Sequence, residues 1–181
     1  DNRLHEQSVA EWHAALDEVE AAEGPAALVT TGNGRFYSNG LDLEGLIDRG
    51  TLGGVIAELA RLWARLLRLP LYSVAAVNGH AFAAGAMLTL AHDARVMRAG
   101  RGYWCLPEAD MGATLAPGMT ALIMAKLPIA TAHDAILTAR RYGGAEAVGA
   151  AIVDEATAED RVLDRAVELA AARAATSRAA T

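Results

Sequence analysis

Short strand-like segments alternate with helical patterns along this chain, and this alternation limits the possible folds more than any other feature. The strand-like segments are apolar and end at turn-forming glycine or asparagine. Strands that alternate with helices form a mostly parallel sheet, so the sequence predicts an α/β fold in a single domain, residues 1–181. The predicted strands are 26–31, 71–77, 93–99 and "AIVDEA" (151–156), and the predicted helices are 8–22, 51–69, one after residue 77, 117–127, 129–140 and a final Ala/Arg/Glu-rich segment. Ser8-Val9-Ala10-Glu11 has the form of a capping box and predicts the start of the first helix.

Charge and composition exclude several classes of function. The formal net charge of −6 argues against a nucleic-acid-binding protein, which needs a basic surface. No apolar run approaches the roughly 20 residues that span a bilayer, so no membrane association is expected. A single cysteine, Cys105, gives neither a disulfide nor a metal cluster, and no metal is predicted. The Ala/Arg-rich composition and the lack of a targeting segment predict a cytoplasmic protein, of bacterial origin.

The segment "NGHAFAAGAMLTLAHD" (78–93) is unusually rich in glycine and alanine. Small residues bury little apolar area, and they suit places where a backbone must come close to something else. One interpretation is tight packing of a helix against the sheet. The other compares this segment with "TTGNGRFYSNGLDL" (30–43), where a strand also runs into small residues. Unpaired backbone N–H groups from two such junctions, aimed at one point, would form an oxyanion hole.

Several motifs, in order, resemble the enoyl-CoA hydratase/isomerase, or crotonase, superfamily over about residues 26–165. They are "RFYSNGLDL" (35–43), "VNGHAFAAGAMLTLAHDARVM" (77–97), "LPEADMG" (106–112) and "AAIVDEA" (150–156). The resemblance implies a crotonase-like spiral of ββα units with a C-terminal helical region, assembled as a homotrimer or a dimer of trimers. Compared with the family, the strand pair before the first helix is expected to be missing and the C-terminal helices to be shortened.

The resemblance also implies a set of site residues. The thioester oxygen of an acyl-CoA substrate would accept hydrogen bonds from the backbone N–H groups of Asn39 and Ala84, and Glu108 would move the proton. No permanently bound cofactor is implied, because the coenzyme A thioester is itself the substrate. Further substrate contacts are expected at Ser38, Gly40, Leu41, Gly85, Met87 and Met111.

The reaction that the resemblance implies depends on Met87. Hydratases of the family carry a second glutamate at that position, and a methionine can neither activate water nor deliver a proton. A lone Glu108 suits an isomerase of fatty-acid β-oxidation that moves the double bond of a 3-enoyl-CoA to the trans-2 position. The alternatives are another crotonase reaction, such as hydration or thioester hydrolysis, and a non-catalytic acyl-CoA-binding subunit. Asp110 is a rival for the acid, because spacing alone does not separate it from Glu108.

One further group of residues has two interpretations. Arg61, Arg65 and Arg68 fall on one stripe of the predicted helix 51–69. They would meet the phosphates of coenzyme A, or they would simply form a solvated face.

Overall fold

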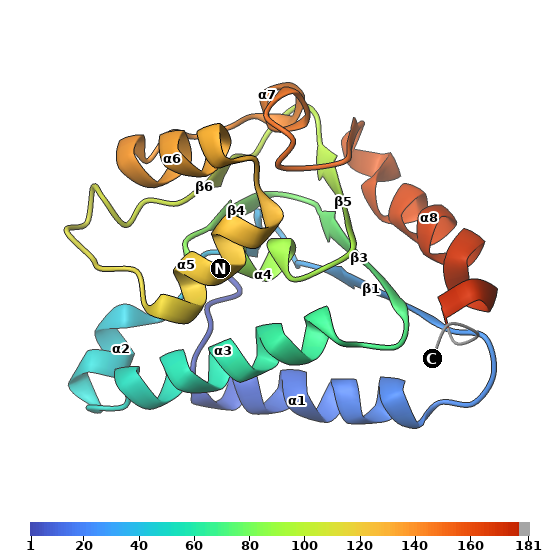
Figure 1. Cartoon of the computed structure of the whole chain (residues 1–181), viewed down its shortest axis with the longest axis horizontal. Helices are drawn as coiled ribbons and strands as arrows, with labels where there is room; N and C mark the ends of the chain where they lie inside the picture. Colours follow the sequence, from blue (N-terminus) through green and yellow to red (C-terminus); the bar gives the residue numbers. More distant parts are fainter. Residues whose placement is uncertain (178–181) are drawn as a thin grey trace.

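The computed structural model describes residues 1–177, and its longer strands form one parallel sheet. The sheet consists of β1 (Ala27–Thr31), β3 (Tyr72–Val77), β5 (Ala94–Arg98) and β7 (Glu155–Thr157), in the order β1-β3-β5-β7 (Figure 1). Strands that lie next to one another in this sheet follow one another along the chain, with one short strand and at least one helix between them. Each time the chain comes back to the sheet, it therefore adds one strand at the same edge.

A second parallel sheet continues each of the first three strands. It consists of β2 (Phe36–Ser38), β4 (His80–Phe82) and β6 (Trp104–Cys105), in the order β2-β4-β6. The chain therefore makes two strands, one in each sheet, before it enters a helix, and repeats this step with β3 and β5. This is the spiral of ββα units that the family resemblance implies. The short strands of the second sheet are not among the predicted elements, because two or three residues carry no readable alternation.

Glycines allow the chain to turn from the first sheet into the second. A Cβ at Gly79 would collide with the carbonyl group of Arg35, and one at Gly102 would lie 3.0 Å from the carbonyl carbon of Gly79. Gly102 also has φ +125°, which side chains rarely tolerate. The corners of successive units are thus packed backbone against backbone, and this sets the spacing of the second sheet.

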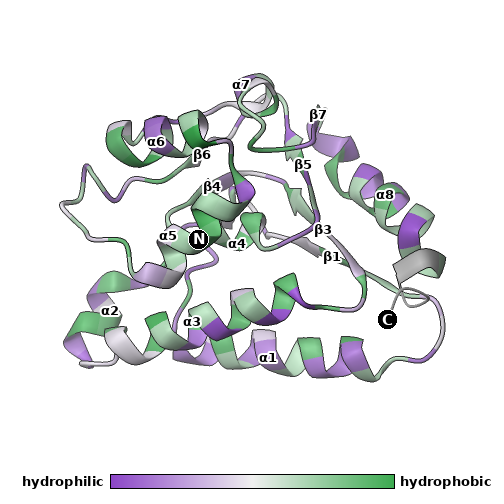
Figure 2. Ribbon diagram, viewed as in Figure 1, coloured by the Kyte–Doolittle hydropathy of each residue, from purple (hydrophilic) through white to green (hydrophobic). Residues whose placement is uncertain are grey.

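The helices cover both faces of the first sheet. One face carries the main core, which includes the long helices α1 (Glu6–Ala21) and α3 (Leu52–Leu67). On the other face, α8 (Val162–Ser177) packs on β1, β3 and β5 (Figure 1). At the centre, α4 (Ala84–Leu90) is hydrophobic in Figure 2, and each of its residues is buried. The remaining elements are α2 (Leu43–Asp48), α5 (Pro117–Lys126), α6 (Ile129–Thr138), α7 (Gly144–Gly149) and the 3-10 helix Glu159–Arg161.

Two predicted elements start more than one residue away from the observed start. The first helix begins at Glu6, because His5 is the N-cap: its ring accepts from the Ser8 N–H at 3.4 Å, and the Ser8 hydroxyl accepts from the His5 N–H at 2.9 Å. Ser8 is therefore the third helical residue of the capping box and not its first. The predicted strand 151–156 forms a strand only from Glu155, because Ala151 adopts φ +54° and turns the chain before it.

Within residues 1–177, no helix combines the length and hydrophobicity that crossing a bilayer requires.

Candidate active site

A cavity of about 410 Å³ lies where the β2–α2 junction, the start of α4 and the segment after β6 meet. Its walls are mostly apolar. Glu108 is the one acid and Arg3 the one cation that the described residues contribute to them. Of the residues predicted for the site, Asn39, Leu41, Ala84, Glu108 and Met111 line this cavity. The fold thus brings together residues from three successive units of the spiral.

The start of α4 lies directly against the β2–α2 junction. A Cβ at Gly40, whose φ is +77°, would lie 3.4 Å from the backbone nitrogen of Ala84, and one at Gly85 would lie 2.7 Å from the Ser38 hydroxyl. Only glycine fits at either place. What approaches the small-residue segment is therefore another part of the chain, while Ala84 itself remains open to the cavity.

The Ala84 N–H is the first amide of α4 and has no acceptor within residues 1–177. Its direction is set by Ala83, which has φ +51° and ψ −125°. This conformation is costly for a residue with a side chain, and such strain concentrates at functional sites. An amide that faces a largely apolar cavity without a partner is available to a ligand oxygen.

The contacts of the β2–α2 junction favour Leu41 over Asn39 as a second donor. The Asn39 N–H donates to the carbonyl oxygen of Asp1 at 3.0 Å, so it is already engaged. Leu41 forms a parallel bridge with Leu4, in which Leu4 bonds the two residues that flank Leu41. The N–H of Leu41 takes no part in this bridge and has no acceptor in the described part of the chain. Sequence spacing gave no means to tell these neighbouring amides apart.

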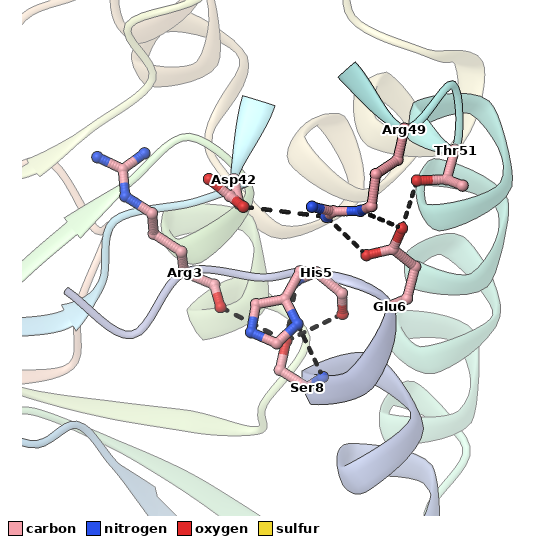
Figure 3. Close-up of polar contacts among 7 residues, drawn as sticks. All are labelled: Arg3, His5, Glu6, Ser8, Asp42, Arg49 and Thr51. Carbon is pink, nitrogen blue, oxygen red and sulfur yellow. Dashed lines mark hydrogen bonds and ion pairs between the residues drawn. The ribbon is translucent and has the colours of Figure 1, made fainter. Parts of the chain in front are cut away.

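A network of charged residues holds this junction against the beginning of α1 (Figure 3). Arg49 donates to both carboxylate oxygens of Glu6, at 3.1 and 2.9 Å, and lies 4.0 Å from Asp42. Thr51 donates to Glu6 as well. The hydrogen bonds from Arg49 and Thr51 lower the pKa of Glu6 to about 2. Asp42, directly after Leu41, is thus tied to two other segments.

Glu108 is placed in the cavity by a turn at residues 107–112. Its Oε2 atom is buried and has no hydrogen-bond partner in the described chain. Burial raises the pKa of the Glu108 carboxyl above its ordinary value. Asp110 is exposed and does not line the cavity, because the segment turns and is not extended. The structure therefore separates the two candidate acids: Glu108 lines the cavity and Asp110 does not.

Several predicted contact residues lie behind the cavity wall. The Ser38 hydroxyl donates to the Asn2 carbonyl at 2.8 Å and accepts from the Gly40 N–H at 3.3 Å, so it shapes the junction. Gly40 and Gly85 serve the close approach described above. Met87 is fully buried in α4. Direct substrate contact is therefore not supported for these four residues.

Other lining residues are absent from the sequence-based set. Leu52 and Ile56 of α3 and Met119 of α5 form part of the apolar wall, and Arg3 lies at its rim. The helical spacing of Leu52 and Ile56 places them on one face of α3. The sequence pattern does not indicate that this part of the helix lines a cavity. No signal in the sequence marks Arg3.

The arginine stripe of α3 does not reach the cavity. Arg65 bonds Asp17 and Glu20 of α1 at 2.6 and 2.9 Å, and Arg61 pairs with Glu58 on its own helix. Arg68 donates to a carbonyl of the same helix. These contacts support the interpretation as a surface face that joins two helices.

Comparison with known proteins identifies the class that this fold and cavity define. The family model described as Enoyl-CoA hydratase/isomerase matches residues 1–181. The peroxisomal enoyl-CoA delta isomerase 2 of Arabidopsis thaliana is 34% identical over 180 residues, which are 93% of this chain and 75% of that protein. The 2,3-dehydroadipyl-CoA hydratase of Escherichia coli is 29% identical over 158 residues, or 86% of this chain and 62% of that protein.

Solved structures show the same fold. A Mycobacterium tuberculosis protein, described both as an enoyl-CoA isomerase and as a probable enoyl-CoA hydratase, is 30% identical, with a TM-score of 0.86 over 97% of this chain and 80% of that one. An enoyl-CoA hydratase of Mycobacterium ulcerans is 28% identical, with a TM-score of 0.92 over 98% of this chain and 78% of that one. The chain belongs to the enoyl-CoA hydratase/isomerase family. It is an enzyme of the crotonase superfamily that acts on acyl-CoA, and its relatives include both isomerases and hydratases.

Proposed function

We propose that the protein is a Δ3,Δ2-enoyl-CoA isomerase, in which Glu108 carries a proton from C2 to C4 of the acyl chain. The observation that carries this proposal is the carboxylate of Glu108, the one acid that residues 1–177 contribute to the cavity, whose buried Oε2 has no hydrogen-bond partner among those residues. The thioester oxygen accepts hydrogen bonds from the N–H of Ala84 and, in place of the predicted Asn39, from the N–H of Leu41.

The reaction begins when the Glu108 carboxylate removes a proton from C2 of a 3-enoyl thioester. The C2–H electron pair becomes part of a dienolate, whose negative charge rests largely on the thioester oxygen. Each backbone donor at that oxygen contributes about 3 to 4 kcal/mol to the stability of the transition state. The protonated Glu108 then returns the proton to C4, and the double bond lies between C2 and C3. No other reactant is consumed.

The environment of Glu108 suits both halves of this exchange. Burial disfavours the charged carboxylate, which makes it a stronger base than an exposed glutamate. The apolar wall that includes Leu52, Ile56 and Met119 provides room for the acyl chain and keeps water from the dienolate.

The cavity supports an isomerase better than a hydratase. Hydration of a 2-enoyl thioester divides water activation and proton delivery between paired acids. The described residues that line the cavity include no second acid, and Met87, at the position where the resemblance implies one in hydratases, is fully buried behind the wall. A single carboxylate that accepts and returns the same proton needs no such partner.

The decisive experiment compares two reactions of the purified protein and of Glu108→Gln, which keeps the size of the side chain. Isomerisation of a 3-enoyl-CoA should be much faster than hydration of the 2-enoyl-CoA, and Glu108→Gln should lower the isomerisation rate by about 100-fold or more. Asp110→Asn is the matched control and should retain the rate. Hydration that exceeds isomerisation would favour the alternative crotonase reaction. Tight binding of the CoA ester without turnover of either substrate would favour a binding subunit.

We also propose that the chain assembles as a homotrimer or a dimer of trimers. Large apolar side chains are exposed on the neighbouring helices α5 and α6, at Met124, Ile129 and Leu137. An exposed apolar surface of this kind is typical of a protein–protein contact.

A further inference from the structure

A second cavity, of about 700 Å³, lies at the other end of β4 from the proposed active site. His80 begins β4 and lines this second cavity, whereas Phe82 ends β4 and lines the first. The walls of the second cavity come from the sheet-to-sheet corners and from the segment that precedes α8. They include Arg35, Arg98, Arg101, Tyr103 and Glu159, and we call this hollow the arginine cavity.

Positive charge is concentrated at the arginine cavity, although the chain as a whole has a formal net charge of −6. Arg98 forms an ion pair with Glu159 at 2.5 Å, but its Nε atom is buried without an acceptor in the described chain. Arg35 and Arg101 are exposed and have no acidic partner within residues 1–177. The cavity thus holds more guanidinium groups than the protein itself neutralises.

The positive charges around the arginine cavity also affect the imidazole of His80. Burial lowers the pKa of His80, and the charges of Arg35, Arg98, Arg101 and the nearby Arg141 lower it further. Both effects disfavour the charged imidazole, so the positive charge of the hollow comes mainly from arginine.

Aromatic rings form one side of the arginine cavity. The His80 ring lies 5.2 Å from the Phe36 ring and 5.7 Å from the Tyr103 ring, between centroids. The Tyr103 N–H donates to Nδ1 of His80 at 3.2 Å, which fixes the imidazole. Tyr103 keeps 43% of its surface exposed, so a flat surface remains open beside the arginines.

We propose that the arginine cavity binds a ligand with two adjacent phosphate groups, of the nucleoside diphosphate class. Guanidinium groups from two separate corners can each form paired hydrogen bonds with phosphate oxygens. A diphosphate supplies the negatively charged partner that Arg35 and Arg101 lack within residues 1–177. The exposed face of Tyr103 offers a surface on which a base stacks. The inference does not depend on the isomerase proposal, because it concerns a different cavity.

Calorimetric titration with inorganic pyrophosphate tests the charge component at one fixed salt concentration. The wild-type protein should bind at sub-millimolar concentration. Arg101→Ala should raise the dissociation constant by about tenfold or more, as expected for loss of a charge-assisted contact. Arg35→Ala/Arg101→Ala should raise it further. The control is Arg61→Ala, which removes another exposed arginine, on α3, and should change the constant less than about twofold.

Two further titrations identify the source of the diphosphate. ADP that binds more tightly than pyrophosphate, with adenosine alone failing to bind, supports the stacking surface and a free nucleotide. Displacement of pyrophosphate by coenzyme A also supports the diphosphate site and shows that the diphosphate of coenzyme A can occupy it. Glu108→Gln should retain pyrophosphate binding, so failure of the isomerase proposal would not affect this readout. Absence of pyrophosphate binding at about 1 mM, or an equal loss in Arg61→Ala, would overturn the inference.

Discussion

Gly40 packs against Ala84 so closely that a methyl group at Gly40 would lie 3.4 Å from the Ala84 nitrogen and 2.9 Å from the Phe82 carbonyl oxygen. Gly40 also has φ +77°. Gly40→Ala should therefore displace the two proposed amide donors relative to each other. We expect kcat/KM for isomerisation to fall by about 100-fold or more, the effect of losing one oxyanion donor. Gly53→Ala, at an open position on α3, is the control and should retain activity. Full activity of Gly40→Ala would mean that the donors do not act at this junction.

The pH dependence of isomerisation should show the raised pKa of Glu108. Only the carboxylate removes the C2 proton, so activity should fall as the pH drops through the pKa of this group. Burial places that pKa above the ordinary value of 4.5, and the acid limb of the kcat/KM profile should lie above pH 4.5. An acid limb at or below pH 4.5 would show that Glu108 is not the base or is well solvated in the active enzyme.

Met87→Glu should destabilise the protein without creating a hydratase. Met87 is fully buried and does not line the cavity, so a glutamate there would be a buried charge without a partner. We expect a loss of several kcal/mol in the free energy of unfolding, measured by urea denaturation. Met87→Leu, which conserves volume, should cost less than about 1.5 kcal/mol. A stable Met87→Glu protein that hydrates 2-enoyl-CoA would show that position 87 reaches the substrate.

Folding stability should decrease in mild acid because of His92. This residue is fully buried between the Thr30 hydroxyl, at 2.9 Å, and the Leu88 carbonyl, at 3.0 Å. Burial lowers its pKa from 6.5 to about 4, so the unfolded chain takes up this proton at higher pH than the folded one. Stability is fully present above about pH 6.5 and is lost as the pH falls toward 4. The loss attributable to this residue is roughly 3 kcal/mol.

Urea titrations at pH 7 and pH 4 check this expectation. The difference in unfolding free energy should shrink in His92→Gln. His133→Gln, at an exposed position on α6, should show the wild-type difference. An unchanged difference in His92→Gln would assign the acid sensitivity to other groups.

The oligomeric state should depend on the apolar surface of α6. Light scattering after size exclusion should give three or six times the mass of one chain. Ile129→Glu/Leu137→Glu should produce a smaller species, because it places charge where 75% and 61% of these side chains are exposed for contact. Leu163→Glu, at an exposed position on α8, is the control. A wild-type monomer would contradict the proposed assembly.

The sequence was sufficient for the fold class and for the long elements, because their apolar patterns extend over enough residues to be read. It did not reveal β2, β4 and β6, whose two or three residues are held by neighbouring strands and by corner glycines. These short strands position the proposed site, so the detailed arrangement of its residues could not be predicted from the sequence either.

The same distinction applies to single residues. The choice between Glu108 and Asp110 depends on a turn at residues 107–112, which the sequence alone did not indicate. The choice between the amides of Asn39 and Leu41 depends on contacts with Asp1 and Leu4, far from the junction in sequence. Every residue except proline has a backbone N–H, so the side chains in the sequence do not indicate which of these groups acts as a donor.

The corner glycines have a consequence for how this protein tolerates change. The proposed donors belong to two consecutive turns of the spiral, whose pitch is constrained where Gly79 packs against the carbonyl group of Arg35. Substitutions of the donor side chains leave that pitch intact. A one-residue insertion between a corner and its donor would move the donor amide away from the cavity, so a change in loop length should be more damaging than a substitution of the donor side chains themselves.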